Sequence, residues 1–135
     1  MGSTRWLDSL HNVFYIVYIT YFGQLIRDRR EKLRETDRRY SLRQVAMRIG
    51  VEPAYLSKIE RGDVAPPSEA TTVKLAKELG EDSDVLLAMA GKVSSDLQET
   101  IRKRPKLFAD LIRQLKQAPD HAILRIVREV REGDW

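Results

Sequence analysis

Hydrophobic residues recur every three or four positions along most of this chain, which predicts helices and not strands. The first clear stripe, from Tyr21 to Glu35, is amphipathic, with apolar side chains turned inward and Arg27, Arg30 and Arg34 expected on the outside together with Lys32. Shorter segments with the same period follow at 42–49, 53–59, 69–79 and 84–90, and each ends near a glycine. The pattern predicts an all-α fold with five helices between residues 21 and 91.

Start and stop signals mark the second and third of these helices. Ser41 has Gln44 three residues later, so each side chain is expected to bond the other's backbone amide in a capping box. Gly50 can adopt the left-handed conformation that ends a helix, and Pro53 suits a first helical position. Two short helices separated by so tight a break are typical of a helix-turn-helix.

The fourth and fifth helices are bounded in the same way. Ser68 is expected to cap the fourth helix, whose inward face we assign to Val73, Leu75 or Ala76, and Leu79. Ser83 is expected to cap the fifth helix, which carries Val85, Leu86 and Met89. Both helices would complete a core with the first three.

The apolar N-terminal extension, residues 1–20, fits both a helix and a strand. Its β-branched and aromatic residues favour a strand, but its helical stripe continues in phase into the next element, so we favour a helix. The run from Val13 to Phe22 is too short to span a bilayer, and neither a signal peptide nor a myristoylation motif fits. Such a segment is expected to cover a partner subunit or its own domain.

The C-terminal region, residues 92–135, also has a helical pattern. Ser95 and Gln98 suggest another capping box, and Pro105 restarts the chain. Two apolar stripes joined at Ala118 and Pro119 predict a helical hairpin, which folds back on the first five helices or pairs with a second copy; we favour a dimer. The expected dimerisation residues are Leu107, Phe108, Leu111, Ile112, Leu115, Ile123, Ile126, Val127 and Val130.

Composition limits the classes of function. A chain of 135 residues suffices for one compact domain with an appendage, and the absence of cysteine excludes disulfides and thiolate zinc sites and fits a reducing cytoplasm. Residues 27–61 carry eleven basic and six acidic side chains, whereas the segments on either side are close to neutral. Positive charge concentrated there indicates a phosphate-backbone partner, although interleaved acidic residues also fit a solvated helix face.

The segment 41–62, and more loosely 22–91, resembles the Cro/lambda-repressor-like helix-turn-helix domain, also called the XRE family. The matching residues are Val45, Ala46, Ile49, Gly50, Val51, Tyr55, Leu56, Ser57, Lys58, Ile59, Glu60, Arg61 and Gly62, extended by Pro67-Ser68, Leu75-Ala76 and Leu79-Gly80. The resemblance implies a five-helix DNA-binding domain and covers about half of the chain. One position departs from it: family members often have Gln after the capping serine, where this chain has Leu42.

Helical geometry separates inward from outward residues in the two helices of the helix-turn-helix, the second of which is predicted to read DNA. Val45, Ala46, Ile49, Leu56 and Ile59 are expected inside. Counting 100° per residue turns Ala54, Ser57, Lys58 and Arg61 outward, with Pro53 at the exposed leading end, and an α-helix fits the DNA major groove. We therefore expect Ala54 to touch a thymine methyl, Ser57 to donate or accept, Lys58 to donate to guanine, and Arg61 to reach a base or a phosphate.

Other side chains are expected at the DNA backbone. The amino end of the second helix, with Ser41 and Arg43, offers free amides and a positive dipole to a phosphate, and Arg38 or Arg39 can assist. Tyr55 is assigned to the flank of the interface as a phosphate contact or packing residue. Glu60 leans towards the core, where Arg27 or Arg30 is the expected partner.

No pattern in the sequence points to an enzyme. His11 and His121 lack partners at metal-ligand spacing, and no nucleophile motif or glycine-rich phosphate loop is present, so we expect no metal and no cofactor. The expected function is sequence-specific binding of double-stranded DNA by a cytoplasmic prokaryotic or phage homodimer, acting as a repressor on a two-fold operator, without a membrane. The alternative is an antitoxin-like protein whose C-terminal helices hold a partner protein while the helix-turn-helix regulates its own promoter.

Overall fold

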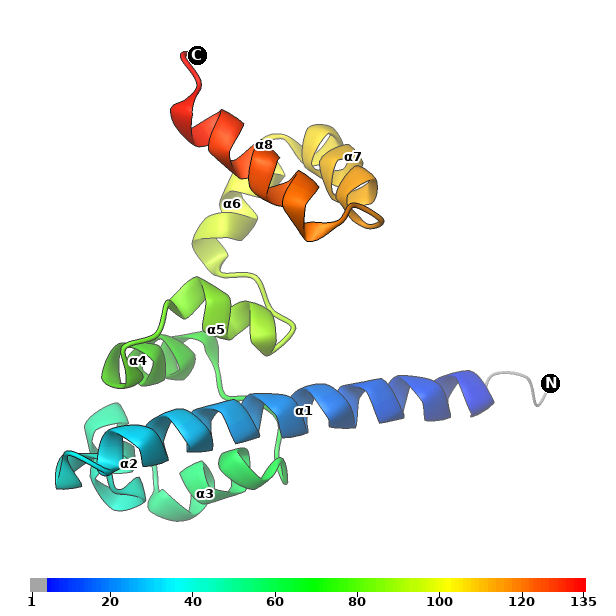
Figure 1. Cartoon of the computed structure of the whole chain (residues 1–135). Helices are drawn as coiled ribbons and strands as arrows, with labels where there is room; N and C mark the ends of the chain where they lie inside the picture. Colours follow the sequence, from blue (N-terminus) through cyan, green and yellow to red (C-terminus); the bar gives the residue numbers. More distant parts are fainter. Residues whose placement is uncertain (1–4) are drawn as a thin grey trace. The chain divides into compact units, whose positions relative to one another are not determined.

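The computed structural model describes residues 5–135, with side chains from Ile16 onward. The described chain is helical and contains no strand, which confirms the all-α prediction (Figure 1). Its elements are α1 (Arg5–Arg34), the short 3-10 turn η1 (Arg38–Tyr40), α2 (Leu42–Ile49), α3 (Pro53–Arg61), α4 (Glu69–Leu79), α5 (Ser83–Met89), α6 (Ser95–Lys103), α7 (Pro105–Leu115) and α8 (Asp120–Glu132). The chain consists of two compact units, and the boundary between them lies between Ser94 and Ser95.

The first helix is far longer than the sequence pattern predicted. Helix one was expected from Tyr21, but α1 begins at Arg5 and runs without a break for 30 residues. The apolar extension and helix one are therefore a single helix as far as Arg5, and the preference for helix over strand is confirmed there. Continuous periodicity explains this, since Ile19, Phe22 and Ile26 are all buried on one face. The extension's first four residues, and the side chains before Ile16, lie outside the described part.

The core of the first unit draws on all five of its helices. The buried apolar residues are Phe22, Ile26, Val45, Ala46, Ile49, Leu56, Ile59, Leu75, Ala76, Leu79 and Leu86. Helix α1 packs against α3 and α4, and α2 packs against the same two helices. This arrangement fixes α3 from two sides.

Gly23 allows α1 and α3 to meet backbone to backbone. A Cβ atom at this buried position would contact the carbonyl oxygen of Ile59 and lie 2.8 Å from that of Glu60. Only a residue without a side chain fits so close an approach. The glycine thus sets the distance between α1 and the carboxyl end of α3.

The predicted helix caps are partly correct. The Ser41 hydroxyl accepts a hydrogen bond from the Gln44 amide at 3.3 Å, as expected. The reciprocal half of the box is wrong, because the Ser41 amide donates to the carbonyl of Arg38 in the preceding 3-10 turn. Ser68 caps α4 as predicted, whereas α5 is capped by Asp82 and not by Ser83.

Two inward faces also differ from the prediction. Val73 is 39% exposed, and Thr72 is buried in its place beside Leu75. Thr72, Leu75, Ala76 and Leu79 follow the i, i+3, i+4, i+7 stripe, and the Thr72 hydroxyl is satisfied by the Pro67 carbonyl at 3.4 Å. In α5, Val85 is 54% exposed and Leu87 is buried next to Leu86. The other predicted inward residues of these helices are correct, since Leu75, Ala76, Leu79 and Leu86 are buried.

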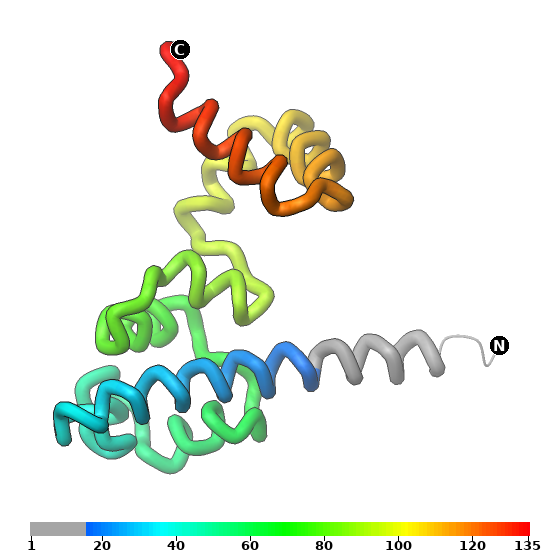
Figure 2. The backbone as a smooth tube through the Cα atoms, viewed as in Figure 1, coloured from blue at the N-terminus to red at the C-terminus, as the bar shows by residue number. Residues whose placement is uncertain are grey.

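The second unit, residues 95–135, consists of α6, α7 and α8, and its path can be followed in Figure 2. Pro105 begins α7, as expected, and a short link at 116–119 leads into α8. Helix α6 already includes Ser95, so the predicted capping residue lies inside the helix. All residues of this unit are described, and none is buried.

Candidate nucleic-acid interface

The turn between α2 and α3 holds the two helices in a fixed relation. Gly50 has a φ of 78°, in the left-handed region, and the Val51 amide donates to the carbonyl of Ala46 at 3.0 Å. Val45, Ala46, Ile49, Leu56 and Ile59 are all buried, which confirms the predicted inward set. Helix α3 is therefore held by its buried side chains, and the face opposite to them is available.

The available side of α3 carries the predicted base-reading residues. Ala54, Lys58 and Arg61 are exposed, and Pro53 and Ser57 are half-buried. The ammonium group of Lys58 has no hydrogen-bond or ion-pair partner among the described residues. Arg61 forms a surface ion pair, with Nε 2.9 Å from Oδ2 of Asp63, and such exposed pairs contribute little to stability. This surface can exchange its solvent contacts for DNA contacts.

The residues predicted to contact phosphates differ in whether they already have a partner in the protein. Arg38 and Arg43 are exposed, and neither has a side-chain partner in the described part of the chain. Arg39 instead donates to Asp37, with Nη2 2.8 Å from Oδ2. Hydrogen bonds from the Arg39 side chain and then from its backbone amide lower the pKa of the Asp37 carboxyl. Tyr55 is 36% exposed, consistent with a flanking position.

Leu42 occupies the position where the family resemblance led us to expect a polar residue. Its side chain is half-buried and packs against the hydrophobic core. It stabilises the start of α2 but offers no hydrogen bond to a phosphate. Any phosphate contact at this edge must come from other residues.

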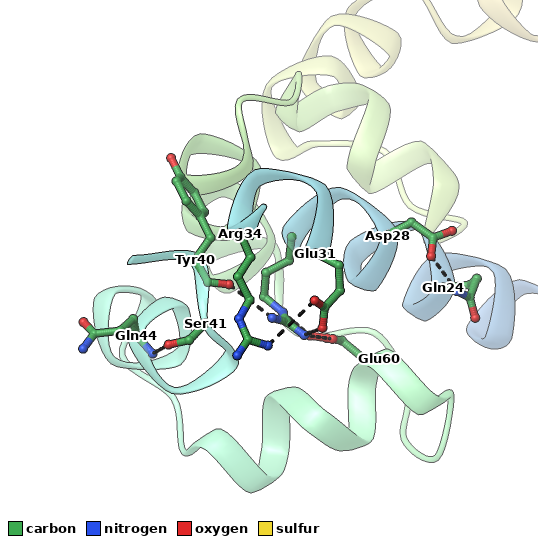
Figure 3. Close-up of polar contacts among 9 residues, drawn as sticks. Gln24, Asp28, Glu31, Arg34, Tyr40, Ser41, Gln44 and Glu60 are labelled. Atoms are coloured by element: carbon green, nitrogen blue, oxygen red, sulfur yellow. Dashed lines mark hydrogen bonds and ion pairs between the residues drawn. The ribbon is translucent and has the colours of Figure 1, made fainter. Parts of the chain in front are cut away.

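A buried ion pair links α1 to α3 (Figure 3). Arg30 donates to Glu60 through Nε at 2.9 Å and Nη2 at 2.8 Å, and both side chains are 4% exposed. Its Nη1 also donates to the Tyr40 carbonyl at 3.1 Å. Burial alone would lower the pKa of Arg30, but the hydrogen bonds and negative charge of Glu60 outweigh it and raise that pKa. The predicted role of Glu60 is confirmed, whereas the expected outward position of Arg30 is wrong.

Beside this ion pair, the surface forms a depression whose arginines from α1 were not among the expected site residues. It is lined by Arg27, Arg30, Glu31 and Arg34 of α1, by Leu42 of α2, and by Ser57, Glu60 and Arg61 of α3. We call it the α1–α3 depression. The spacing of Arg27, Arg30 and Arg34 on one helix face was visible in the sequence, but which face meets α3 was not.

The described residues lack two other classes of site. They hold no cluster of three or more His, Cys, Asp or Glu that could bind a metal ion. None of their helices is long and apolar enough to cross a membrane.

Comparison with known proteins agrees with this geometry. A family model described as helix-turn-helix matches residues 31–86, from the last turn of α1 into α5. Residues 31–86 are a helix-turn-helix domain of the lambda-repressor-like type. Neither the curated proteins nor the solved structures give a match. A helix-turn-helix domain of this kind indicates a transcription regulator that binds double-stranded DNA.

Proposed function

We propose that this protein binds a specific sequence of double-stranded DNA as a homodimer and acts as a transcriptional repressor. The observation that carries the proposal is the face of α3 formed by Ala54, Ser57, Lys58 and Arg61. This face is free of core contacts on a helix that is anchored by Leu56 and Ile59. A rigid helix with one open face is what insertion into a major groove requires.

Each residue of this face has a distinct expected contact. Lys58 is exposed and unpaired, so its ammonium group can donate to guanine O6 or N7. The Ala54 methyl packs on a thymine methyl, Ser57 donates or accepts, and Arg61 reaches a base or a phosphate. Pro53 leads the helix into the groove and keeps its first turn free of an amide that lacks a partner.

Backbone contacts position α3 without reading sequence. Arg43 is the strongest candidate among the residues named from the sequence, because it is exposed and unpaired at the amino end of α2. Arg38 and the Ser41 end of the helix assist it, and Tyr55 flanks the groove. The Arg39 side chain must first break its ion pair with Asp37, so we expect it to contribute less to phosphate binding.

The second unit is the proposed dimer contact. It buries none of its residues, and its exposed apolar side chains include Leu107 at 70% and Val130 at 60%. A second copy would cover the stripes of α7 and α8, made by Leu107, Phe108, Leu111, Ile112, Leu115, Ile123, Ile126, Val127 and Val130. Two recognition helices about 34 Å apart would then read half-sites one helical turn apart.

Two substitutions separate base reading from backbone binding. We expect Lys58→Ala to relax the preference at one base position, with a loss of about 1–3 kcal/mol of discrimination. Arg43→Ala should weaken binding to all sequences alike and flatten the salt dependence. Selection of bound sequences from a random DNA pool, followed by gel shifts on the selected and random duplexes, measures both effects.

Equal losses on specific and random DNA for Lys58→Ala would exclude its role in base reading. Failure of the wild-type protein to select any sequence would overturn the proposed function as a whole. The spacing of the half-sites in the selected sequences tests the dimer directly.

The exposed faces of α7 and α8 also fit an antitoxin-like protein. In that case the C-terminal unit would hold a different protein, while the helix-turn-helix regulates its own promoter. Sedimentation of the purified chain distinguishes the two, because a stable dimer favours self-association. A monomer at all concentrations tested would favour a partner protein.

A further inference from the structure

The α1–α3 depression carries more positive charge than its neighbours neutralise. Four arginines line it, and the only carboxylates among its lining residues are Glu31 and Glu60. Glu60 is engaged in the buried pair with Arg30, while Glu31 lies 3.1 Å from Arg30 Nη2 and 3.8 Å from Arg34 Nη1. Arg27 has no ion-pair partner among the described residues. An anion can therefore enter this site without displacing a strong ion pair.

The depression lies next to the face of α3 assigned to the major groove. Ser57 and Arg61 belong both to that face and to the lining of the depression. Leu42, at the α2 side, offers no donor to the DNA backbone that borders the groove. Figure 3 shows Arg34 extending from α1 towards the space between Ser41 and Glu60. The missing polar contact of α2 can thus be supplied from α1.

Arg30 cannot supply this contact itself. Its Nε and Nη2 donate to Glu60, and its Nη1 donates to the Tyr40 carbonyl. Arg27 and Arg34 lie three residues before it and four after it, on the same side of α1. Arg30 is therefore a positioning residue that holds α1 against α3, while its two neighbours keep donors available.

We propose that Arg27 and Arg34 bind a phosphate of the DNA backbone at the α1 edge of the interface, in the place that Leu42 leaves without a donor. This inference rests on the proposed DNA binding. Guanidinium groups suit the site because their planar donors match phosphate oxygens. The contact positions α3 and carries no sequence information.

The test compares the salt dependence of binding for the full-length protein and its Arg27→Gln/Arg34→Gln variant on a random-sequence duplex. We expect the slope of log K against log salt to become shallower by about 0.9 for each phosphate that the variant no longer binds. The base preferences obtained by selection should stay unchanged, because both residues touch only the backbone. Circular dichroism and thermal unfolding verify that the variant remains folded.

Lys32→Gln is the matched control, since it removes one positive charge from an exposed position on another face of α1. It should leave the slope at the wild-type value, whereas a purely long-range charge effect would change it. Ethylation interference on the selected operator gives a second readout: one phosphate should matter for the wild type and cease to matter for the double variant.

The outcomes separate the two proposals. One outcome is that the wild type binds DNA while the double variant keeps the wild-type slope of log K against log salt and the wild-type interference pattern. In that case Arg27 and Arg34 do not bind a phosphate, and the proposed function stands. If the double variant loses one base preference instead, these arginines read bases and the inference is also wrong. If the wild type binds no DNA, the proposed function itself fails.

Discussion

Both compact units of this chain consist of amphipathic helices, but only the first unit buries residues in a core. In residues 16–94, five helices and a short turn enclose a core that includes fully buried Phe22, Leu56 and Leu75. In residues 95–135, three helices with regular apolar stripes bury no residue. An amphipathic face is therefore a requirement for a core but does not create one.

The number and arrangement of helices explain the difference. Helix α2 is short, but α3 and α4 both pack against it, and Val45, Ala46 and Ile49 become inaccessible. Helix α7 is longer and equally periodic, yet its stripe has too few neighbours within its own unit. The first unit thus encloses a hydrophobic core within one chain, whereas the apolar stripes of the second unit stay exposed.

The largest loss of stability in the first unit is expected when one partner of the buried Arg30–Glu60 ion pair is removed. Arg30→Met would strand the buried Glu60 carboxylate and remove the donor to the Tyr40 carbonyl. We expect a loss of about 3–5 kcal/mol in the free energy of unfolding, measured by urea denaturation. The large cost arises because the remaining charge is desolvated without a partner.

The double variant Arg30→Met/Glu60→Leu is the control for this prediction. Replacing both charges with apolar groups should restore most of the lost free energy, since no unpaired charge remains. A double variant as unstable as the single one would show that Arg30 stabilises the fold chiefly through its other contacts.

A smaller effect is expected at the turn between α2 and α3. Gly50 has a φ of 78°, and an added Cβ would meet no atom within 4 Å. Gly50→Ala therefore imposes backbone strain alone, which should lower the free energy of unfolding by about 1–2 kcal/mol. Chemical denaturation measures the change.

Gly91→Ala provides the comparison at the border of the second unit. Gly91 has a φ of 74° and equally open surroundings, so the local strain is the same. Its cost should be no larger than that at Gly50, because the end of a unit can open locally. A larger cost at Gly91 would mean that residues 91–94 do not open locally and hold the end of the first unit firmly.

The smallest effect on folding, and a clear one on assembly, is expected in α7. Leu107→Gln/Leu111→Gln should change the free energy of unfolding of the first unit by less than about 0.5 kcal/mol, because both side chains are exposed in the single chain. The proposed dimer should dissociate, which sedimentation would detect. Lys106→Gln, in the same helix, is the matched control and should leave the dimer intact. An unchanged dimer in the leucine variant would place the contact elsewhere.

Much of the helix-turn-helix could be predicted from particular residues. Gly50 and Pro53 marked the turn, and helical periodicity separated buried Leu56 and Ile59 from exposed Ala54 and Lys58. One inward position of α4 was wrong, because Thr72 is polar in the sequence but is buried in place of Val73 and donates a hydrogen bond to the Pro67 carbonyl. A polar residue that finds a partner inside the fold cannot be recognised from periodicity alone.

The candidate site likewise has one part that the sequence predicts and another that it does not. Spacing along one helix is a local property, so the exposed face of α3 followed from the sequence. The choice of Arg30 over Arg27 as the partner of Glu60 depended on how α1 crosses α3 at Gly23, which involves residues more than thirty positions apart. The α1–α3 depression depended on the same crossing and could not be foreseen.

By itself, the sequence determined the helices, the turn and the outward face of α3, because hydrogen bonds and side-chain directions within a helix depend on near neighbours. Only the tertiary structure decided that Arg30 is buried while Arg27 and Arg34 remain available, and that the C-terminal unit buries none of its residues. These features depend on packing between distant segments, and helical periodicity contains no information about which faces will meet.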